Sequence, residues 1–296
     1  MKDYSESKRL NQAASALISR HVSASGLDRF RGCGSFLQFK ANEDLSVKKL
    51  HQGNFCKNRF CPICQRNAAR KEAAKIGACM AWVQQVKGKE FILLTLTAPN
   101  VTGDKLKAEI DRFNQAFRRL LVRAEVAPII KGYVRKLEVE HNAERGDYHP
   151  HFHVLIAVNK SYFSDKTYLS QAEWLRLWRE AMRDETIMNL HVCKATMGAN
   201  NELAKYVAKA GSLYASQEVF DTFHAALSRR QLLTFNGLFA EASKLFEAGE
   251  LEEFRKVDTT RWVWLLWYRW AGQDYDEIRR EEFSEEKHGA GEEFDD

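Results

Sequence analysis

The sequence predicts an α+β fold built around an antiparallel sheet of the ferredoxin-like, split β-α-β type. Between residues 91 and 210, apolar β-branched runs and amphipathic segments alternate in the order β-α-β-β-α-β-α. A polar turn, NAERGD, joins two consecutive strand patterns into a hairpin. The chain has 296 residues and 45% hydrophobic content, enough for one large domain or two smaller ones with a buried core.

The first part of the chain combines helical patterns with a cysteine-rich segment. Residues 1–30 are polar and carry apolar side chains at helical spacing. Residues 31–70 are rich in Cys, Gly and basic side chains, and residues 66–86 consist of strong helix formers. We therefore expect residues 1–88 to form a helical, zinc-binding region that contacts DNA.

The next segment contains the strongest strand patterns. Residues 91–99 form an apolar run that ends at proline, which is typical of a buried strand. An amphipathic helix is expected over residues 105–123, followed by the two hairpin strands over residues 129–140 and 149–158.

The same segment closes with a second helix, a strand and a third helix. The second helix should begin at Ser170, because Glu173 follows three residues later as in a capping box. These elements are predicted over residues 170–183, 189–195 and 200–210. We expect residues 89–211 to form one catalytic domain.

The rest of the chain consists of two segments that differ in charge. Residues 212–273 are expected to be mostly helical. Residues 274–296 hold eleven acidic and three basic residues, a net charge of −8, and are expected to form a disordered acidic tail. Since the whole chain carries +5, the preceding 273 residues carry +13. A basic body of this kind favours a polyanionic partner, with nucleic acid the leading candidate.

No pattern in the chain indicates secretion or membrane insertion. The first fifteen residues have no apolar stretch of the kind found in signal peptides, and WVWLLWYRW is too short to span a bilayer. The sequence therefore predicts a cytoplasmic protein with no membrane partner. Its six cysteines should be reduced thiols or metal ligands rather than disulfides.

Four cysteines have spacing that suits a structural zinc ion. The pattern C-x22-C-x4-C-x2-C includes CPIC, a tight turn that lets two sulfur atoms bind one ion. The predicted ligands are Cys33, Cys56, Cys61 and Cys64. His51 is the alternative to Cys33 as the fourth ligand. Cys79 and Cys193 lie in apolar contexts and are expected to be small core residues.

The segment HPHFHVLIAV predicts a second metal site. His149, His151 and His153 alternate along an expected strand, so they share one face, and the opposite apolar face should be the core face. The preceding strand places Glu138 and Glu140 within cross-strand reach. Two histidines and a carboxylate could bind Zn, Mn, Fe or Mg with positions left open for substrate oxygens. The alternative is a hairpin with hydrogen-bonded surface histidines.

A helix further on could supply a nucleophile. In NELAKYVAKAGS, Glu202 lies four residues before Tyr206, and Lys209 lies three residues after it. A carboxylate, a phenol and an ammonium group then share one polar helix face. Tyrosine chemistry at a phosphate needs such a phenol, with a cation to offset the developing charge.

Together these motifs identify a family resemblance. FILLTLTAP, HPHFHVLIAV and ELAKYVAKA, in this order, resemble the three motifs of rolling-circle plasmid replication initiators (Rep proteins). These proteins belong to the single-tyrosine class of the His-hydrophobe-His (HUH) endonuclease superfamily. NFCKNRFCPICQRNAARK resembles the cysteine segment of that class, and RRQLLTFNGLF its post-catalytic segment, so the resemblance covers about residues 33–237.

The resemblance implies a role for each matching residue. His151 and His153 match histidines that hold Mg²⁺ or Mn²⁺, Glu138 matches an acidic residue beside them, and Glu140 is the alternative acid. Tyr206 matches a nucleophile that forms a 5′-phosphotyrosine link. Glu202 and Lys209 match a glutamate that replaces a second tyrosine and the lysine of a Tyr-x-x-Lys element. His149 is expected to lie outside the first coordination shell.

The resemblance also implies a function. A chain of this kind would bind a double-stranded origin, nick one strand in single-stranded or extruded DNA, and leave a 3′-OH primer for host helicase and polymerase. The alternatives are a related HUH transposase or relaxase, or a zinc-stabilised DNA-binding regulator without catalysis. A relaxase is disfavoured because Tyr206 follows the histidine motif instead of lying near the N-terminus.

Overall fold

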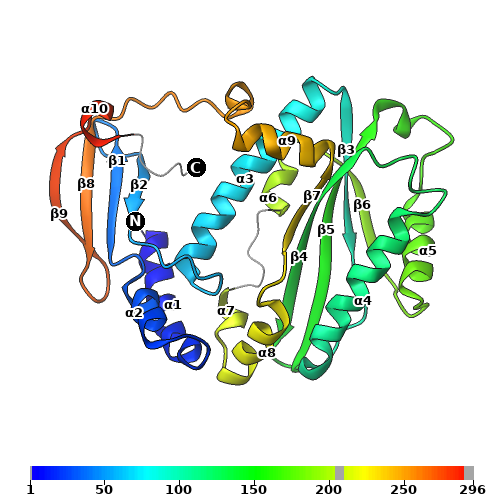
Figure 1. The fold of residues 1–296 in the computed structure, drawn as a ribbon, viewed down its shortest axis with the longest axis horizontal. Helices are drawn as coiled ribbons and strands as arrows, with labels where there is room; N and C mark the ends of the chain where they lie inside the picture. The colour runs from blue at the N-terminus through cyan, green and yellow to red at the C-terminus, as the bar shows by residue number, and fades with distance from the viewer. Residues whose placement is uncertain (1, 204–209, 290–296) are drawn as a thin grey trace. The chain divides into compact units, whose positions relative to one another are not determined.

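The computed structural model of the chain describes residues 2–203 and 210–289 (Figure 1). The fold is α+β with antiparallel sheets. The chain forms two compact units, one of Met1–Lys71 with Val257–Asp296 and one of Glu72–Lys256. This division differs from the expected boundaries, because the end of the chain folds with its beginning. None of the described helices is long and apolar enough to cross a membrane.

The first unit contains a four-stranded antiparallel sheet in the order β2-β1-β8-β9. Its strands are β1 (Phe36–Ala41), β2 (Lys48–Gly53), β8 (Trp264–Trp270) and β9 (Tyr275–Glu282). Its helices are α1 (Lys2–Ile18), α2 (Ala24–Gly32) and α10 (Glu285–His288). The helix α3 (Pro62–Gln85) begins in this unit and continues into the second.

The strands β8 and β9 correct two expectations. The segment expected to be helical up to residue 273 contains β8, and the segment expected to be disordered from residue 274 contains β9 and α10. β8 forms because its aromatic and aliphatic residues pair with β1, a partner more than 200 residues away that no local pattern reveals. β9 forms because it pairs antiparallel with β8, and two of its bases offset acidic neighbours in the pairs Arg279–Glu281 and Arg280–Glu277.

The second unit contains a five-stranded antiparallel sheet in the order β6-β3-β5-β4-β7. Its strands are β3 (Lys89–Leu96), β4 (Gly132–Asn142), β5 (Asp147–Asn159), β6 (Leu190–Ala195) and β7 (Leu233–Gly237). Its helices are α4 (Gly103–Leu121), α5 (Gln171–Met182), α6 (Ala199–Leu203), α7 (Ala210–Leu213), α8 (Gln217–Leu227) and α9 (Leu238–Glu247). β5 lies between β3 and β4, so β3, α4 and β4 form a split β-α-β unit.

Most predicted elements of this unit are confirmed to within a few residues at their ends. The α5 capping box is present, with the Ser170 side chain accepting a hydrogen bond from the Glu173 backbone and Glu173 accepting one from the Ser170 backbone. β7 is a further departure from the helical character expected for residues 212–273, since five residues flanked by helices carry little periodic signal.

Helices cover both faces of the five-stranded sheet (Figure 1). On one face, Leu155 and Ala157 of β5 pack with side chains of α3, α6 and α9. On the other face, Phe152 of β5 packs edge to face on Phe113 and Phe117 of α4. The expectation of one core face on β5 was therefore wrong, because the histidine face becomes apolar and buried beyond His153.

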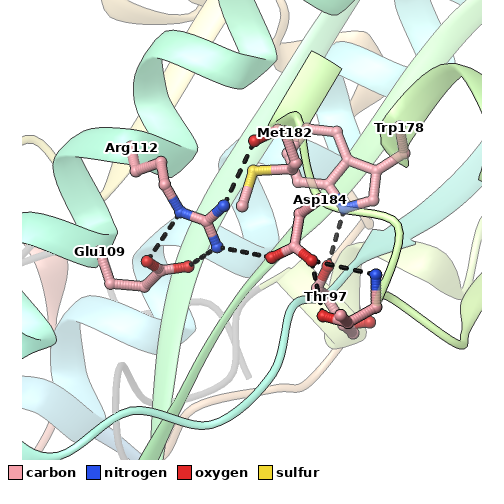
Figure 2. A network of polar contacts seen from close by, with 7 residues as sticks. Thr97, Glu109, Arg112, Trp178, Met182 and Asp184 are labelled. Carbon is pink, nitrogen blue, oxygen red and sulfur yellow. Dashed lines mark hydrogen bonds and ion pairs between the residues drawn. The ribbon is translucent and has the colours of Figure 1, made fainter. Parts of the chain in front are cut away.

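Polar contacts join α4 to α5, and α5 to Thr97, the residue after β3 (Figure 2). The Arg112 guanidinium donates two hydrogen bonds to Glu109, at 2.7 and 2.8 Å, and one each to Asp184 and the Met182 carbonyl, at 3.2 Å. The Trp178 indole N–H donates to the Thr97 carbonyl at 2.7 Å. These bonds satisfy Glu109, Arg112 and the Trp178 indole N–H, which lie beside the buried aromatic side chains of this layer.

Candidate functional site

The histidine strand and its hairpin partner bring a carboxylate and two imidazoles together. Glu138 of β4 lies directly opposite His151 of β5 in the antiparallel register. One oxygen, Glu138 Oε2, lies 3.4 Å from His151 Nε2 and 3.1 Å from His153 Nε2. The ligand atoms of all three residues lie within 4.8 Å of one another, and Glu138 and His151 are buried.

The second nitrogen of each imidazole is held by another group. His151 Nδ1 lies 3.3 Å from the His149 carbonyl, which can accept a hydrogen bond from it and orients the ring with Nε2 toward Glu138. His153 Nδ1 lies 3.3 Å from Thr95 Oγ1 on β3 and can donate to it in the same way. Such outer contacts orient metal-binding histidines and fix their tautomers.

The charge of Glu138 fits a cation site. Burial opposes its ionisation, but hydrogen bonds from His151 and His153 outweigh this effect and lower the pKa of Glu138 to about 2. The carboxylate is therefore ionised at any physiological pH. It offers a negative charge and an oxygen ligand at a place where the side chain is only 8% exposed.

The geometry suits a small divalent cation. Two ligand atoms at right angles around an ion with bonds of about 2.1 Å lie about 3.0 Å apart. The distances of 3.1 and 3.4 Å from the Glu138 oxygen are close to this value. One oxygen and two nitrogen ligands would occupy one side of a six-coordinate ion such as Mg²⁺ or Mn²⁺ and leave the other side for substrate oxygens.

The structure distinguishes Glu138 from the other groups considered near this site. Glu140 lies opposite His149 in the register and is not part of the three-residue group. The His149 ring packs on the His151 ring, with centroids 5.3 Å apart, and is also outside the group.

A partly buried ion pair borders the group on the same sheet face. Lys136 of β4 lies opposite His153 and is only 4% exposed. Its ammonium group pairs with Glu72 of α3. This pair connects α3 to the strand that carries Glu138.

The predicted nucleophile segment is only partly described. Tyr206 and Lys209 lie outside the described residues. Glu202 belongs to α6, the short helix whose Ala199 and Leu203 pack in the core beside Leu155. α6 therefore lies on the sheet face that carries the two histidines.

The four predicted zinc ligands form a second cluster. The Sγ atoms of Cys33 and Cys61 lie 3.5 Å apart, those of Cys33 and Cys64 3.6 Å, and those of Cys56 and Cys64 3.7 Å. Four sulfur atoms around one Zn²⁺ at about 2.3 Å in a tetrahedron lie about 3.8 Å from one another. All four lie within 4.8 Å, so the cluster fits a tetrahedral zinc ion.

The residues around the cluster complement its charge. Lys8 of α1 is 2% exposed, and its ammonium group donates to the carbonyls of Arg31 and Cys33, each at 2.6 Å. Asn11 donates to Cys61 Sγ at 3.4 Å. With Zn²⁺ bound, four thiolates would leave a net charge of −2, which the buried Lys8 ammonium would partly offset.

The remaining candidates lie elsewhere. His51 is in β2 and packs edge to face on Phe283, outside the cysteine cluster. Cys79 is a core residue, as expected, and burial raises the pKa of its thiol to about 12. Cys193 is exposed, because it lies on β6 at the edge of the sheet, so its assignment to the core was wrong.

Sequence reasoning did not single out Thr95, Lys136, Lys8 or Asn11. Thr95 had a weak signal, a hydroxyl residue inside the otherwise apolar run FILLTLTAP. The others had none, because each acts through a partner from a distant segment, as Lys8 does with Cys33.

Removing zinc should destabilise the unit that holds the cysteine cluster. In zinc-finger peptides the metal supplies about 10 kcal/mol or more of apparent binding free energy, which is also folding free energy. We expect one zinc per chain by elemental analysis and a lower melting temperature after replacement of Cys61 by serine. Cys193→Ser is the control, since this exposed thiol lies outside the cluster. Freshly purified protein that contains no zinc would contradict the assignment.

The chain is similar to known replication proteins. The family described as "Replication protein" matches residues 47–275. A relative named "Protein rep" from Staphylococcus aureus is 48% identical over 213 residues, which are 71% of this chain and 93% of that protein. Proteins of the same name from Streptococcus pneumoniae and a Bacillus species are 36% and 31% identical, over 79% and 82% of this chain and 76% and 87% of theirs. No solved structure matches the chain.

Proposed function

Because the chain belongs to the replication protein (Rep) family of plasmid replication initiators, we propose that it starts replication by nicking one strand of origin DNA. The observation that carries this proposal is the group of Glu138, His151 and His153 on adjacent antiparallel strands. The split β-α-β order of the sheet further supports an HUH endonuclease fold. Family membership favours a replication initiator over a related transposase.

The first step is a transesterification by Tyr206. Its phenolic oxygen attacks the scissile phosphorus and loses its proton. The bond from phosphorus to the 3′ oxygen of the preceding nucleotide breaks, and that oxygen gains a proton to become the 3′-OH primer. The 5′ phosphate stays bonded to the tyrosine, so no external energy source is needed.

Glu138, His151 and His153 would hold Mg²⁺ or Mn²⁺, which polarises the scissile phosphate when bound. The chain's own groups then orient the substrate. Lys209 follows Tyr206 by three residues and would offset the charge that develops on the phosphate. Host helicase and polymerase would then extend the 3′-OH.

Nicking of supercoiled DNA tests the proposal. Wild-type protein should convert supercoiled plasmid carrying its origin into the open circle when Mn²⁺ or Mg²⁺ is present, and not when a chelator is added. A plasmid without the origin is the control. Tight origin binding with no nicking under any metal would favour a zinc-stabilised regulator without catalysis.

Replacing Glu202 with alanine should separate initiation from termination. The first cleavage uses the tyrosine oxygen, but ending a round requires hydrolysis of the regenerated site, for which a carboxylate is a suitable general base. Such a base contributes roughly 10²–10⁴-fold in rate. We expect the variant to nick and join DNA but to release few single-stranded circles, so that multimeric products accumulate.

Two other outcomes of the Glu202 experiment are informative. If Glu202 only pairs with a lysine on the helix surface, worth about 0.2–0.5 kcal/mol, both steps should change little. If nicking and termination fall by the same factor, Glu202 serves the first step and the proposed division of labour is wrong.

A further inference from the structure

We propose that Arg135, Arg118 and Tyr133 form a binding site for backbone phosphates of DNA. Arg135 and Tyr133 are odd-numbered positions of β4, so they point to the sheet face opposite Lys136 and Glu138. The site is therefore separate from the Glu-His-His group. The inference rests on the proposed function in one respect, namely that the phosphate belongs to a DNA strand.

Two aromatic rings fix the position of the Arg135 guanidinium. Its central carbon lies 4.4 Å from the centre of the Phe152 ring and 4.9 Å from that of Phe117. The Tyr133 ring packs edge to face on the same Phe117 ring, with centroids 5.2 Å apart. Because the rings belong to β5 and α4, cation–π contacts hold the arginine against the buried aromatic side chains of these two elements.

Neither arginine of this site has an acidic partner among the described residues. No hydrogen bond or ion pair joins Arg135, Arg118 or the Tyr133 hydroxyl to any residue in ranges 2–203 and 210–289, and these side chains are partly or fully exposed. Arg112 provides the contrast on the same helix as Arg118, since Figure 2 shows its guanidinium bound to two carboxylates, those of Glu109 and Asp184.

Arg118 is the residue after Phe117 on α4, and the Phe117 ring lies 4.9 Å from the Arg135 guanidinium, so the two arginines are neighbours. Burial is the main effect that lowers the pKa of Arg135, and the positive charge of Arg118 lowers it further. Holding two like charges together, with one of them partly desolvated, costs free energy that a bound anion would recover. The ring contacts account for the position of Arg135, but they leave its N–H donors and the charge of Arg118 without an acidic partner, which an anionic ligand would supply.

The donors present fit phosphate. A guanidinium group offers parallel N–H donors that match two oxygens of a phosphate, and arginine binds such groups in a bidentate manner. The Tyr133 hydroxyl can donate a further hydrogen bond. DNA is the source we favour, because the 273 residues before the acidic C-terminal segment carry a net charge of +13.

Salt dependence of DNA binding tests the site directly. The slope of log K against log salt should become shallower by about 0.9 for each duplex phosphate that the variant no longer neutralises, or about 0.7 for single strands. We expect this change for Arg118→Gln in fluorescence anisotropy with a labelled origin oligonucleotide. Arg123→Gln is the matched control, because it removes one charge from the same region but its guanidinium already pairs with Glu180 at 2.7 Å.

A second, more conservative variant tests the site in case Arg118→Gln does not fold. Arg135→Lys keeps a cation between the rings but loses the bidentate geometry, so it should weaken binding of origin and unrelated DNA by the same factor. Its melting temperature should stay close to that of wild type. Identical salt slopes for wild type, Arg118→Gln and Arg123→Gln would overturn the inference.

Two further measurements separate the alternative explanations. If inorganic pyrophosphate raises the melting temperature of wild type but not of Arg118→Gln, while the DNA slopes of the two proteins are equal, the site binds a free phosphate compound and the assignment to DNA is wrong. Nicking of a short single-stranded oligonucleotide by wild type tests the proposed function alone. If wild type does not nick the oligonucleotide but Arg118→Gln still has a shallower salt slope, the endonuclease activity is rejected and the phosphate site is retained.

Discussion

Replacing His151 with alanine should abolish nicking while DNA binding survives. His151 Nε2 is one of three ligand atoms, and the loss of one leaves an incomplete site for the divalent cation. Metal polarisation of a phosphoryl oxygen is worth several kcal/mol of transition-state stabilisation. At about 1.4 kcal/mol for each factor of ten, nicking should fall by about 10³-fold or more. Binding should remain, since it depends largely on basic residues that contact phosphates.

Two other histidines serve as controls for this experiment. His191→Ala removes an exposed imidazole from β6, and His149→Ala removes a ring that packs on His151 but keeps the carbonyl that accepts from it. Both variants should retain most of the nicking rate. Binding of Mn²⁺, measured by calorimetry, should be lost in His151→Ala and retained in both controls. Nicking at the wild-type rate in His151→Ala would show that the ion lies elsewhere.

The same assay decides which acid is the third ligand. Glu138 shares its oxygen with both imidazoles, whereas Glu140 lies opposite His149. Glu138→Gln should therefore lose Mn²⁺ binding and nicking, and Glu140→Gln should keep both. The reverse result would contradict the geometry of the group.

The limits of sequence prediction are clear in this pair of glutamates. Period-two alternation places Glu138 and Glu140 on the same strand face as the histidines, so it cannot choose between them. The hairpin register makes the choice, and the turn sets that register. Asn142 accepts hydrogen bonds from the backbone of Glu144 and Arg145, and Gly146 has a positive φ of 67°. The turn therefore pairs Asn142 with Asp147, and this pairing places Glu138 opposite His151.

Elements with strong local patterns could be predicted, and elements that depend on distant partners could not. HPHFHVLIAV and FILLTLTAP carry their own alternation or apolar run, and both form strands. β8 has no polar alternation, so its own residues do not distinguish a strand from a helix, and its pairing with β1 decides the outcome. β9 is an acidic segment that forms a strand because β8 offers an edge to pair with. The resemblance to plasmid replication initiators is confirmed by the family match.

Replacing Tyr206 with phenylalanine should remove the covalent protein–DNA product. Phenylalanine keeps the aromatic ring and deletes only the oxygen that attacks the phosphorus, so folding and DNA binding should not change. Incubation of wild type with a single-stranded oligonucleotide spanning the nick site and Mn²⁺ should give an adduct whose mass equals that of the protein plus the 5′-phosphorylated product fragment. Peptide mapping should place the adduct on Tyr206, and the Phe variant should form none.

Tyr214 is the control for this experiment, because it also follows the histidine motif and lies only eight residues further on. Its ring stacks on Phe220 of α8, with centroids 6.3 Å apart, a packing contact that Tyr214→Phe preserves. The Tyr214 variant should therefore form the adduct at the wild-type level. Loss of the adduct in Tyr214→Phe, with retention in Tyr206→Phe, would mean that the third motif is misaligned. The attacking phenol would then belong to the segment between α7 and α8, where Tyr214 lies.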